Sequence, residues 1–167
     1  MFKNKKGFTL IELLVVIAII GVLASIVLAS LNNARLKSRN ARRITDIKQL
    51  QLALELYFDG AGGGQYAGTL ATLVTGNYIP SIPIDPLGNT GALCRTAIGY
   101  CFWVPAAGSR TTYHLGANIE DAANSVQLMA SDKDCNSGTG AGCTSGVTYS
   151  GGFNGNPSPD IIYDVQP

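Results

Sequence analysis

The sequence predicts an α+β fold in which one long N-terminal α-helix, membrane-spanning in its first half, packs against a small antiparallel β-sheet head. Two observations carry this prediction. An uncharged apolar run, Leu13–Leu31, continues into a helical pattern that ends near residue 58. Short alternating or β-branched stretches bounded by Gly, Asn and Pro follow after residue 99. A disordered chain is excluded, because 46% of the residues are hydrophobic and the net charge is only +1.

The run Leu13–Leu31 is long enough to cross a membrane as a helix. Only Gly21, Ser25 and Ser30 interrupt it, and as a helix it extends about 28 Å, close to the roughly 30 Å hydrocarbon core of a bilayer. A secretory signal peptide has a shorter apolar region, about 7–15 residues, and ends at a small-residue cleavage site. The sequence therefore favours a membrane span. Because it is the only long apolar run, a multi-pass membrane protein is excluded.

The helix continues beyond this run as an amphipathic segment. A helix over about Phe8–Phe58 would be on the order of 75 Å long. Asp59-Gly60 is expected to stop it, with Gly60 in the left-handed cap position. Apolar residues spaced by three and four predict the face that the head covers: Ile44, Ile47, Leu50, Leu54, Tyr57 and Phe58.

The first part of the head combines a short helix with an extended segment. Leu70, Leu73 and Val74 suggest the helix, which Thr75-Gly76-Asn77 would close. Pro80, Pro83 and Pro86 then force an extended crossing, because proline fixes φ and disfavours helix in the residue before it. The isoleucines of this crossing are expected to face the long helix: Ile79, Ile82 and Ile84.

An antiparallel sheet of three or four strands is expected next. The candidate strands are about Gly99–Pro105, Arg110–Leu115 and Val126–Ala130. Residues 136–160 are rich in Gly, Ser, Asn and Thr and are expected to be mostly loop.

Charge is distributed unevenly along the chain. Residues 1–60 hold nine basic and four acidic residues, whereas the remainder holds three basic and seven acidic ones. A nucleic-acid-binding globular domain needs positive charge on its folded part. The head lacks that charge, and the sequence assigns no nucleic-acid partner.

The residues before the apolar run carry a specific motif. Lys5-Lys6-Gly7-Phe8-Thr9-Leu10-Ile11-Glu12-Leu13 resembles the processing site of type IV pilins and type II secretion pseudopilins. In that family a short basic leader stays in the cytoplasm, a prepilin peptidase cuts after the glycine, and the new N-terminal residue is methylated. The resemblance implies cleavage between Gly7 and Phe8, methylation of Phe8, and the pilin fold.

Glu12 stands out in its apolar surroundings. A carboxylate at the edge of a membrane helix is costly unless it has a partner or reaches the interface. The resemblance implies that Glu12 pairs with the Phe8 ammonium of a neighbouring subunit in a filament. An unpaired buried charge is strongly unfavourable, so such a pair would enforce the register of assembly. The alternative is a glutamate at the membrane interface.

Two features depart from expectation. Members of the family often carry proline where this chain has Ala29, so helix melting during assembly is in doubt here. Three lysines precede the span and five basic residues follow it within Arg35–Arg43. The positive-inside rule alone would place the head in the cytoplasm, whereas the peptidase motif and the cysteines place it outside.

The resemblance implies a structural subunit rather than an enzyme. Its partners would be prepilin peptidase, an inner-membrane assembly platform and further copies of itself in a homo-oligomeric filament. The precursor would be a single-pass protein of the inner membrane with its head outside the cytoplasm. The assembled subunit would lie in an extracellular pilus or a periplasmic pseudopilus. The leading interpretation is a surface type IV pilus serving adhesion, motility or DNA uptake. The alternatives are a pseudopilin of a type II secretion system and a monomeric membrane-anchored binding module. The expected domains are a leader (1–7), a transmembrane and filament-core helix (8–31), an amphipathic continuation (32–59) and the head (60–167).

The four cysteines indicate disulfides. They contain no CxxC pair, which disfavours zinc, and an even count outside the cytoplasm favours disulfides. Three connectivities are possible, and bridges that close two short loops are favoured: Cys94 with Cys101, and Cys135 with Cys143.

Two polar features remain in the head. Asp132, Asp134 and Asn136 stand at alternate positions, as in a calcium loop, but Ser137 and Cys143 replace the glycine and the bidentate glutamate of an EF-hand. Because some pseudopilins bind calcium after the sheet, these three remain a weak candidate site, with a solvated acidic turn as the alternative. His114 has no nucleophile and acid motif around it and is expected to be structural.

Overall fold

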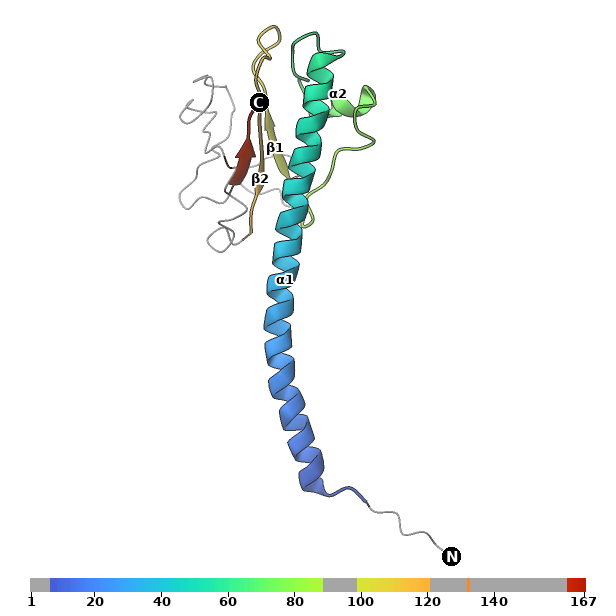
Figure 1. Ribbon diagram of the computed structural model, residues 1–167, viewed down its shortest axis with the longest axis vertical. Helices are drawn as coiled ribbons and strands as arrows, with labels where there is room; N and C mark the ends of the chain where they lie inside the picture. Colours follow the sequence, from blue (N-terminus) through green and yellow to red (C-terminus); the bar gives the residue numbers. More distant parts are fainter. Residues whose placement is uncertain (1–6, 89–98, 121–131, 133–161) are drawn as a thin grey trace, which may run out of the picture. The chain divides into compact units, whose positions relative to one another are not determined.

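The computed structural model describes residues 7–88, 99–120, 132 and 162–167, and it confirms the α+β class (Figure 1). The chain forms two compact units, Met1–Lys37 and Ser38–Pro167. The elements of the described ranges are α1 (Leu10–Asp59), α2 (Leu70–Thr75), β1 (Tyr100–Trp103), β2 (His114–Asn118) and β3 (Ile162–Val165).

In the first unit, α1 leaves its apolar side chains uncovered. Every described side chain from Leu10 to Leu31 is exposed. By length and composition this helix could cross a membrane. The Ser25 hydroxyl donates a hydrogen bond to the Val22 carbonyl at 2.7 Å, so this polar group is satisfied within the apolar stretch.

The second unit contains a three-stranded antiparallel sheet in the order β1-β2-β3. Leu115 at its centre lies opposite Phe102 of β1 and Val165 of β3, and Ala117 lies opposite Tyr100 and Tyr163. Alternate residues of a strand point to the same side. One face of the sheet is therefore apolar across all three strands.

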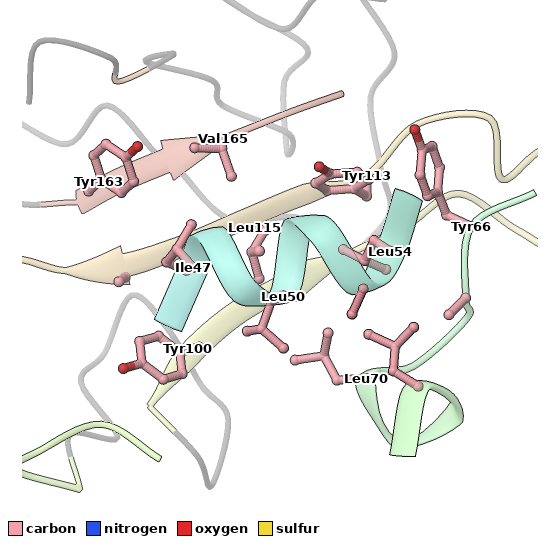
Figure 2. Packing of buried hydrophobic residues seen from close by; sticks show 14 of the residues in the cluster. Ile47, Leu50, Leu54, Tyr66, Leu70, Tyr100, Tyr113, Leu115, Tyr163 and Val165 are labelled. Carbon is pink, nitrogen blue, oxygen red and sulfur yellow. The ribbon is translucent and has the colours of Figure 1, made fainter. Parts of the chain in front are cut away.

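The second half of α1 packs on this apolar face (Figure 2). Ile47, Leu50 and Leu54 are fully buried, as the helical spacing predicts. Burying one such side chain contributes roughly 1.5–3 kcal/mol. Tyr66 and α2 close the same core, and Ile44, Tyr57 and Phe58 are partly buried against it.

The ends of the two helices differ in how well they were predicted. α2 forms as expected, and the Gly76 amide donates to the Thr72 carbonyl at 2.9 Å. The prediction that Gly60 adopts the left-handed cap conformation is wrong. The chain instead forms a hydrogen-bonded turn after α1, in which the Gly62 amide donates to the Tyr57 carbonyl at 2.7 Å. Positive φ angles follow at Gly63 (56°) and Gly64 (83°).

The strand predictions are partly wrong. β1 lies inside the expected stretch, but β2 begins at His114 rather than Arg110. The Arg110 carbonyl accepts the Tyr66 amide at 2.7 Å, so this residue pairs with a loop instead of a strand. β3 was not predicted, because Asp164 interrupts its apolar pattern. The expected strand Val126–Ala130 and the loop 136–160 lie outside the described residues.

The proline-rich crossing differs from the prediction at one isoleucine. Ile79 and Ile82 are partly buried against the core, as expected. Ile84 is 58% exposed, and the neighbouring Asp85 is buried in its place. The inward position therefore belongs to a carboxylate, whose partner lies on α1.

Candidate functional site

The expected cleavage point lies in an open part of the chain. Gly7, Phe8 and Thr9 are not helical, and α1 begins at Leu10 rather than at Phe8. The Phe8 side chain is 87% exposed, and a Cβ atom on Gly7 would meet nothing within 4 Å. An exposed non-helical segment is the kind of backbone that a protease can engage.

Thr9 and Glu12 form a capping box at the start of α1. The Glu12 amide donates to Thr9 Oγ1 at 3.3 Å, while Glu12 Oε2 accepts from the Thr9 amide at 2.8 Å and from the Thr9 hydroxyl at 2.6 Å. This reciprocal pair satisfies amides that the first turn leaves unpaired, which explains why the helix starts at Leu10. The T-x-x-E spacing of Thr9 and Glu12 in the sequence could have predicted this start of the helix. The pairing of Glu12 with Phe8 of a neighbour stays a prediction.

A buried ion cluster fixes the second half of α1 to the head. The fully buried guanidinium of Arg43 donates from Nε to Asp85 Oδ2 at 2.5 Å and from Nη2 to Oδ1 at 3.1 Å. Its Nη1 donates to Asn40 Oδ1 at 2.8 Å and to Glu120 Oε1 at 2.6 Å. Arg43 therefore holds two loops that are distant from each other in sequence.

A second arginine completes the cluster at Glu120, just after β2. Arg39 donates from Nε to Glu120 Oε1 at 2.9 Å and from Nη2 to Oε2 at 2.5 Å. Asn40 bonds the Glu120 backbone twice, donating to its carbonyl at 2.6 Å and accepting from its amide at 3.0 Å. The two arginines and two carboxylates balance in charge, and that balance is what makes such burial tolerable.

The cluster shifts the ionisation of its members. The hydrogen bond from Arg39 and the bond and charge of Arg43 outweigh partial burial and lower the pKa of Glu120 to about 2. Burial opposes the charge of Arg43, yet the bonds to Asp85 and Glu120 hold its pKa above the usual value. Arg39, Arg43 and Glu120 are therefore charged at neutral pH.

This cluster is not predicted from the sequence alone. In the sequence, Arg39 and Arg43 belong to the basic residues that follow the membrane span, and Asp85 lies in the proline-rich crossing. Helical spacing does indicate that Arg43 is buried, because it precedes Ile47 and Leu50 by four and seven residues and so lies on the same buried face of α1.

Tyrosines of the head bind two further carboxylates of α1. The Tyr100 hydroxyl donates to Asp46 Oδ2 at 2.6 Å, and the Tyr66 hydroxyl lies 3.0 Å from Glu55 Oε2. Burial, followed by these hydrogen bonds, raises the pKa of both tyrosines. Both therefore act as hydrogen-bond donors throughout the physiological range.

The sheet face that points away from α1 carries polar residues. His114 Nε2 bonds the Asp164 carboxylate, and the Asp164 amide donates to Asp132 Oδ1 at 2.7 Å. Burial lowers the pKa of His114 to about 3, against the opposing effect of the Asp132 charge. The imidazole is therefore neutral and donates to Asp164, which is the structural role expected of it.

The disulfide and calcium predictions are mostly outside the described residues. Cys101 is disulfide-bonded, but Cys94, Cys135 and Cys143 are not described, so the connectivity stays a prediction. Asp134 and Asn136 are likewise not described. Within the described ranges, no group of three or more His, Cys, Asp or Glu side chains could hold a metal ion.

Comparison with known proteins identifies the family. Residues 2–28 match the family model of the prokaryotic N-terminal methylation motif. The type II secretion system core protein G of Vibrio cholerae is 35% identical over 100 residues, covering 52% of this chain and 68% of that protein. The chain belongs to the pilin and pseudopilin family. The core protein G of Escherichia coli is 36% identical over 100 residues, 52% of this chain and 69% of that protein.

A fimbrial protein is also similar to this chain. Fimbrial protein EcpC of Eikenella corrodens is 33% identical over 95 residues, which cover 55% of this chain and 62% of that protein. No solved structure is significantly similar to the chain. The methylation-motif match spans Gly7, Phe8 and Glu12, so the resemblance that singled out these residues is confirmed at the level of the family.

Proposed function

We propose that this chain is the structural subunit of a helical filament, cut between Gly7 and Phe8 and methylated at Phe8. The observation that carries this proposal is the first half of α1, whose described apolar side chains are all exposed. Apolar surface on this scale needs a bilayer or other chains to cover it. In a membrane-inserted precursor, lipid covers this apolar surface. In the assembled filament, the helices of neighbouring copies cover it instead.

The proposal includes the location and the partners of the precursor. The span would sit in the inner membrane with the head outside the cytoplasm, where disulfides such as that of Cys101 are stable. Prepilin peptidase would cut the exposed bond before α1. An assembly platform in the inner membrane would then add the subunit to the growing filament, where Glu12 pairs with Phe8 of a neighbour.

We favour the pseudopilus of a type II secretion system as the filament. This choice differs from the leading interpretation of the sequence alone, a surface type IV pilus. It rests on the relatives named core protein G, of which this chain covers 68% and 69%. The fimbrial relative, covered to 62%, supports the surface pilus as the second candidate.

Mass spectrometry of the N-terminal peptide tests both parts of the proposal. We expect a methylated Phe8 terminus rather than the intact leader. In the membrane and periplasmic fraction alone, this terminus supports a pseudopilus. In material sheared from the cell surface it supports a pilus. An intact Met1 leader in both fractions would contradict processing and the filament with it.

A further inference from the structure

The first unit ends in two exposed cations that lie far from its only carboxylate. Arg35 and Lys37 follow the apolar run Leu13–Leu31 by four and six residues, and both are exposed. The single acidic residue in the sequence of this unit is Glu12. It precedes Arg35 by 23 residues, or about 34 Å along the helix. Both positive charges are therefore available to an anion outside the unit.

The other basic residues that follow the span have carboxylates close to them. The five basic residues within Arg35–Arg43 oppose a head outside the cytoplasm under the positive-inside rule. Arg39 and Arg43 are bound to carboxylates in the buried ion cluster, and Arg42 lies 3.9 Å from Asp46. The first two basic residues of this stretch have no carboxylate within ion-pair distance in the described part of the chain. They are the ones whose charge the protein leaves uncompensated.

The position of these two cations along the helix matches the headgroup layer of a bilayer. When Leu13–Leu31 fills the hydrocarbon core, the Cα atoms of Arg35 and Lys37 lie about 6 Å and 9 Å beyond its edge. The polar layer on each side of the core is roughly 5–8 Å thick. Because Cα–Cβ bonds in a helix point toward its N-terminus, both side chains lean back toward the membrane. Long basic side chains at the end of a span reach the interface in this way.

The chemistry of the two side chains fits phosphate. A guanidinium can bind two phosphate oxygens in parallel, and an ammonium binds phosphate as a point charge. Arg35 and Lys37 are two residues apart, or about 200° around the helix, so they face different lipids on opposite sides. The residues between the apolar run and Arg35 are Asn32, Asn33 and Ala34. None of them carries a negative charge that would repel a phosphate.

We propose that Arg35 and Lys37 bind the phosphates of anionic lipids in the leaflet on the head side of the membrane, and so hold the precursor at a fixed depth. This inference rests on the membrane-inserted precursor of the proposed function and names its lipid partner. Each basic residue near an anionic membrane surface favours binding by about fivefold. Because filament assembly moves the helix out of lipid, these phosphate contacts are ones that assembly has to break.

Photocrosslinking in vesicles of known composition tests this contact on the full chain. A benzophenone amino acid replaces Ala34, an exposed residue next to Arg35. The chain is reconstituted in vesicles of equal parts phosphatidylglycerol, which is anionic, and phosphatidylcholine, which has no net charge. After irradiation, mass spectrometry counts the adducts of each lipid at position 34. Both leaflets have the same composition, so the orientation of the chain in the vesicle does not affect the ratio.

The expected result is an excess of the anionic lipid that depends on these two residues. We expect the chain with both cations to give at least about five phosphatidylglycerol adducts for each phosphatidylcholine adduct. R35Q/K37Q should return the ratio to that of the lipid mixture. R42Q/K48Q is the matched control, because it removes the same charge from exposed residues later in α1, and it should keep the excess. Both double variants alter only exposed side chains, so the unfolding transition followed by the single Trp103 should stay unchanged.

The other outcomes overturn the lipid contact and separate it from the proposed function. An adduct ratio equal to the lipid mixture, an excess that survives R35Q/K37Q, or an equal loss in R42Q/K48Q would each contradict binding at these two residues. Adducts mainly with a second copy of the chain would assign the cations to a protein partner instead. The N-terminal peptide from cells is measured separately. A processed Phe8 terminus without the lipid excess overturns this contact alone, whereas an intact leader with the excess overturns the processing and leaves the contact standing.

Discussion

Individual residues make the stability of the second unit depend on pH in two ranges that overlap between about pH 3 and pH 4.5. Burial lowers the pKa of His114 from 6.5 to about 3, so between these values the unfolded chain binds more protons and acid destabilises the fold. Arg39 and Arg43 lower the pKa of Glu120 from 4.5 to about 2. Its contribution is complete above pH 4.5 and is lost as the pH falls toward 2.

We predict that wild-type protein loses at most about 2 kcal/mol of unfolding free energy between pH 7 and pH 5 through His114. His114→Gln should remove most of this slope, because no imidazole is then left to be protonated in the unfolded state. Urea unfolding of the full chain in detergent, followed by the fluorescence of Trp103, measures it. Trp103 lies opposite His114 in the sheet and is the single tryptophan.

Glu120→Gln is the matched variant for the lower range. It should keep the slope between pH 5 and 7 and lose part of the slope below pH 4.5, where Glu120 is protonated in the unfolded chain. If His114→Gln retained the full slope between pH 5 and 7, a neutral buried imidazole would be ruled out.

Among the structural elements, the attachment of α1 to the head depends on the buried ion cluster as well as on the apolar core. Arg43 touches both the turn at Asp85 and the segment after β2 at Glu120. Removing one partner from a buried ion pair leaves the other charge without compensation, which typically costs about 3–5 kcal/mol.

We therefore predict that Arg43→Met destabilises the second unit by about 3 kcal/mol or more. Arg42→Met is the matched control, because Arg42 is exposed and reaches Asp46 only at 3.9 Å. A surface pair of this kind contributes under about 1 kcal/mol. Urea unfolding compares the two variants at pH 7. Equal losses of unfolding free energy in both variants would show that the buried ion pairs of Arg43 stabilise the unit no more than an exposed pair does.

Helical spacing predicted the α-helical elements well. The stripe that contains Ile47, Leu50 and Leu54 is buried as expected, and α2 forms where it was placed. Such patterns are local, because the spacing of apolar residues along a helix reports directly on which side is covered. The start of α1 could also have been predicted, from the T-x-x-E spacing of Thr9 and Glu12.

Long-range partners could not be predicted in this way. Asp85 reads as a surface residue of a turn, and only the folded chain brings Arg43 to it. β3 was missed for the same reason, since Asp164 is buried through its bond to His114 on another strand. Whether a charge is buried depends on a partner that a single sequence does not identify.

On the scale of the whole molecule, the two units have different surfaces. The first is an apolar helix with nothing in the described chain to cover it, and the second has its own core. The second unit can therefore fold on one chain, whereas the first needs surroundings. Processing and assembly would change those surroundings from lipid to other copies of the chain.

We propose that this change depends on Glu12. Its carboxylate is held by Thr9 in the single chain, and in the filament it would pair with the Phe8 amine of a neighbour. We predict that Glu12→Gln inserts into the membrane normally but yields few or no filaments, because the neutral amide cannot form the ion pair. Asp59→Asn, which neutralises an exposed carboxylate at the other end of α1, should assemble normally.

Assembly through the Glu12 and Phe8 pair is tested by counting filaments by electron microscopy, both in sheared material and in the membrane and periplasmic fraction of cells that produce the wild-type chain, Glu12→Gln or Asp59→Asn. We predict abundant filaments for the wild type and Asp59→Asn, and a near-complete loss for Glu12→Gln at equal amounts of membrane-inserted protein. Abundant normal filaments from Glu12→Gln would contradict assembly through the Glu12 and Phe8 pair. Absence of filaments from the wild type would contradict the filament itself.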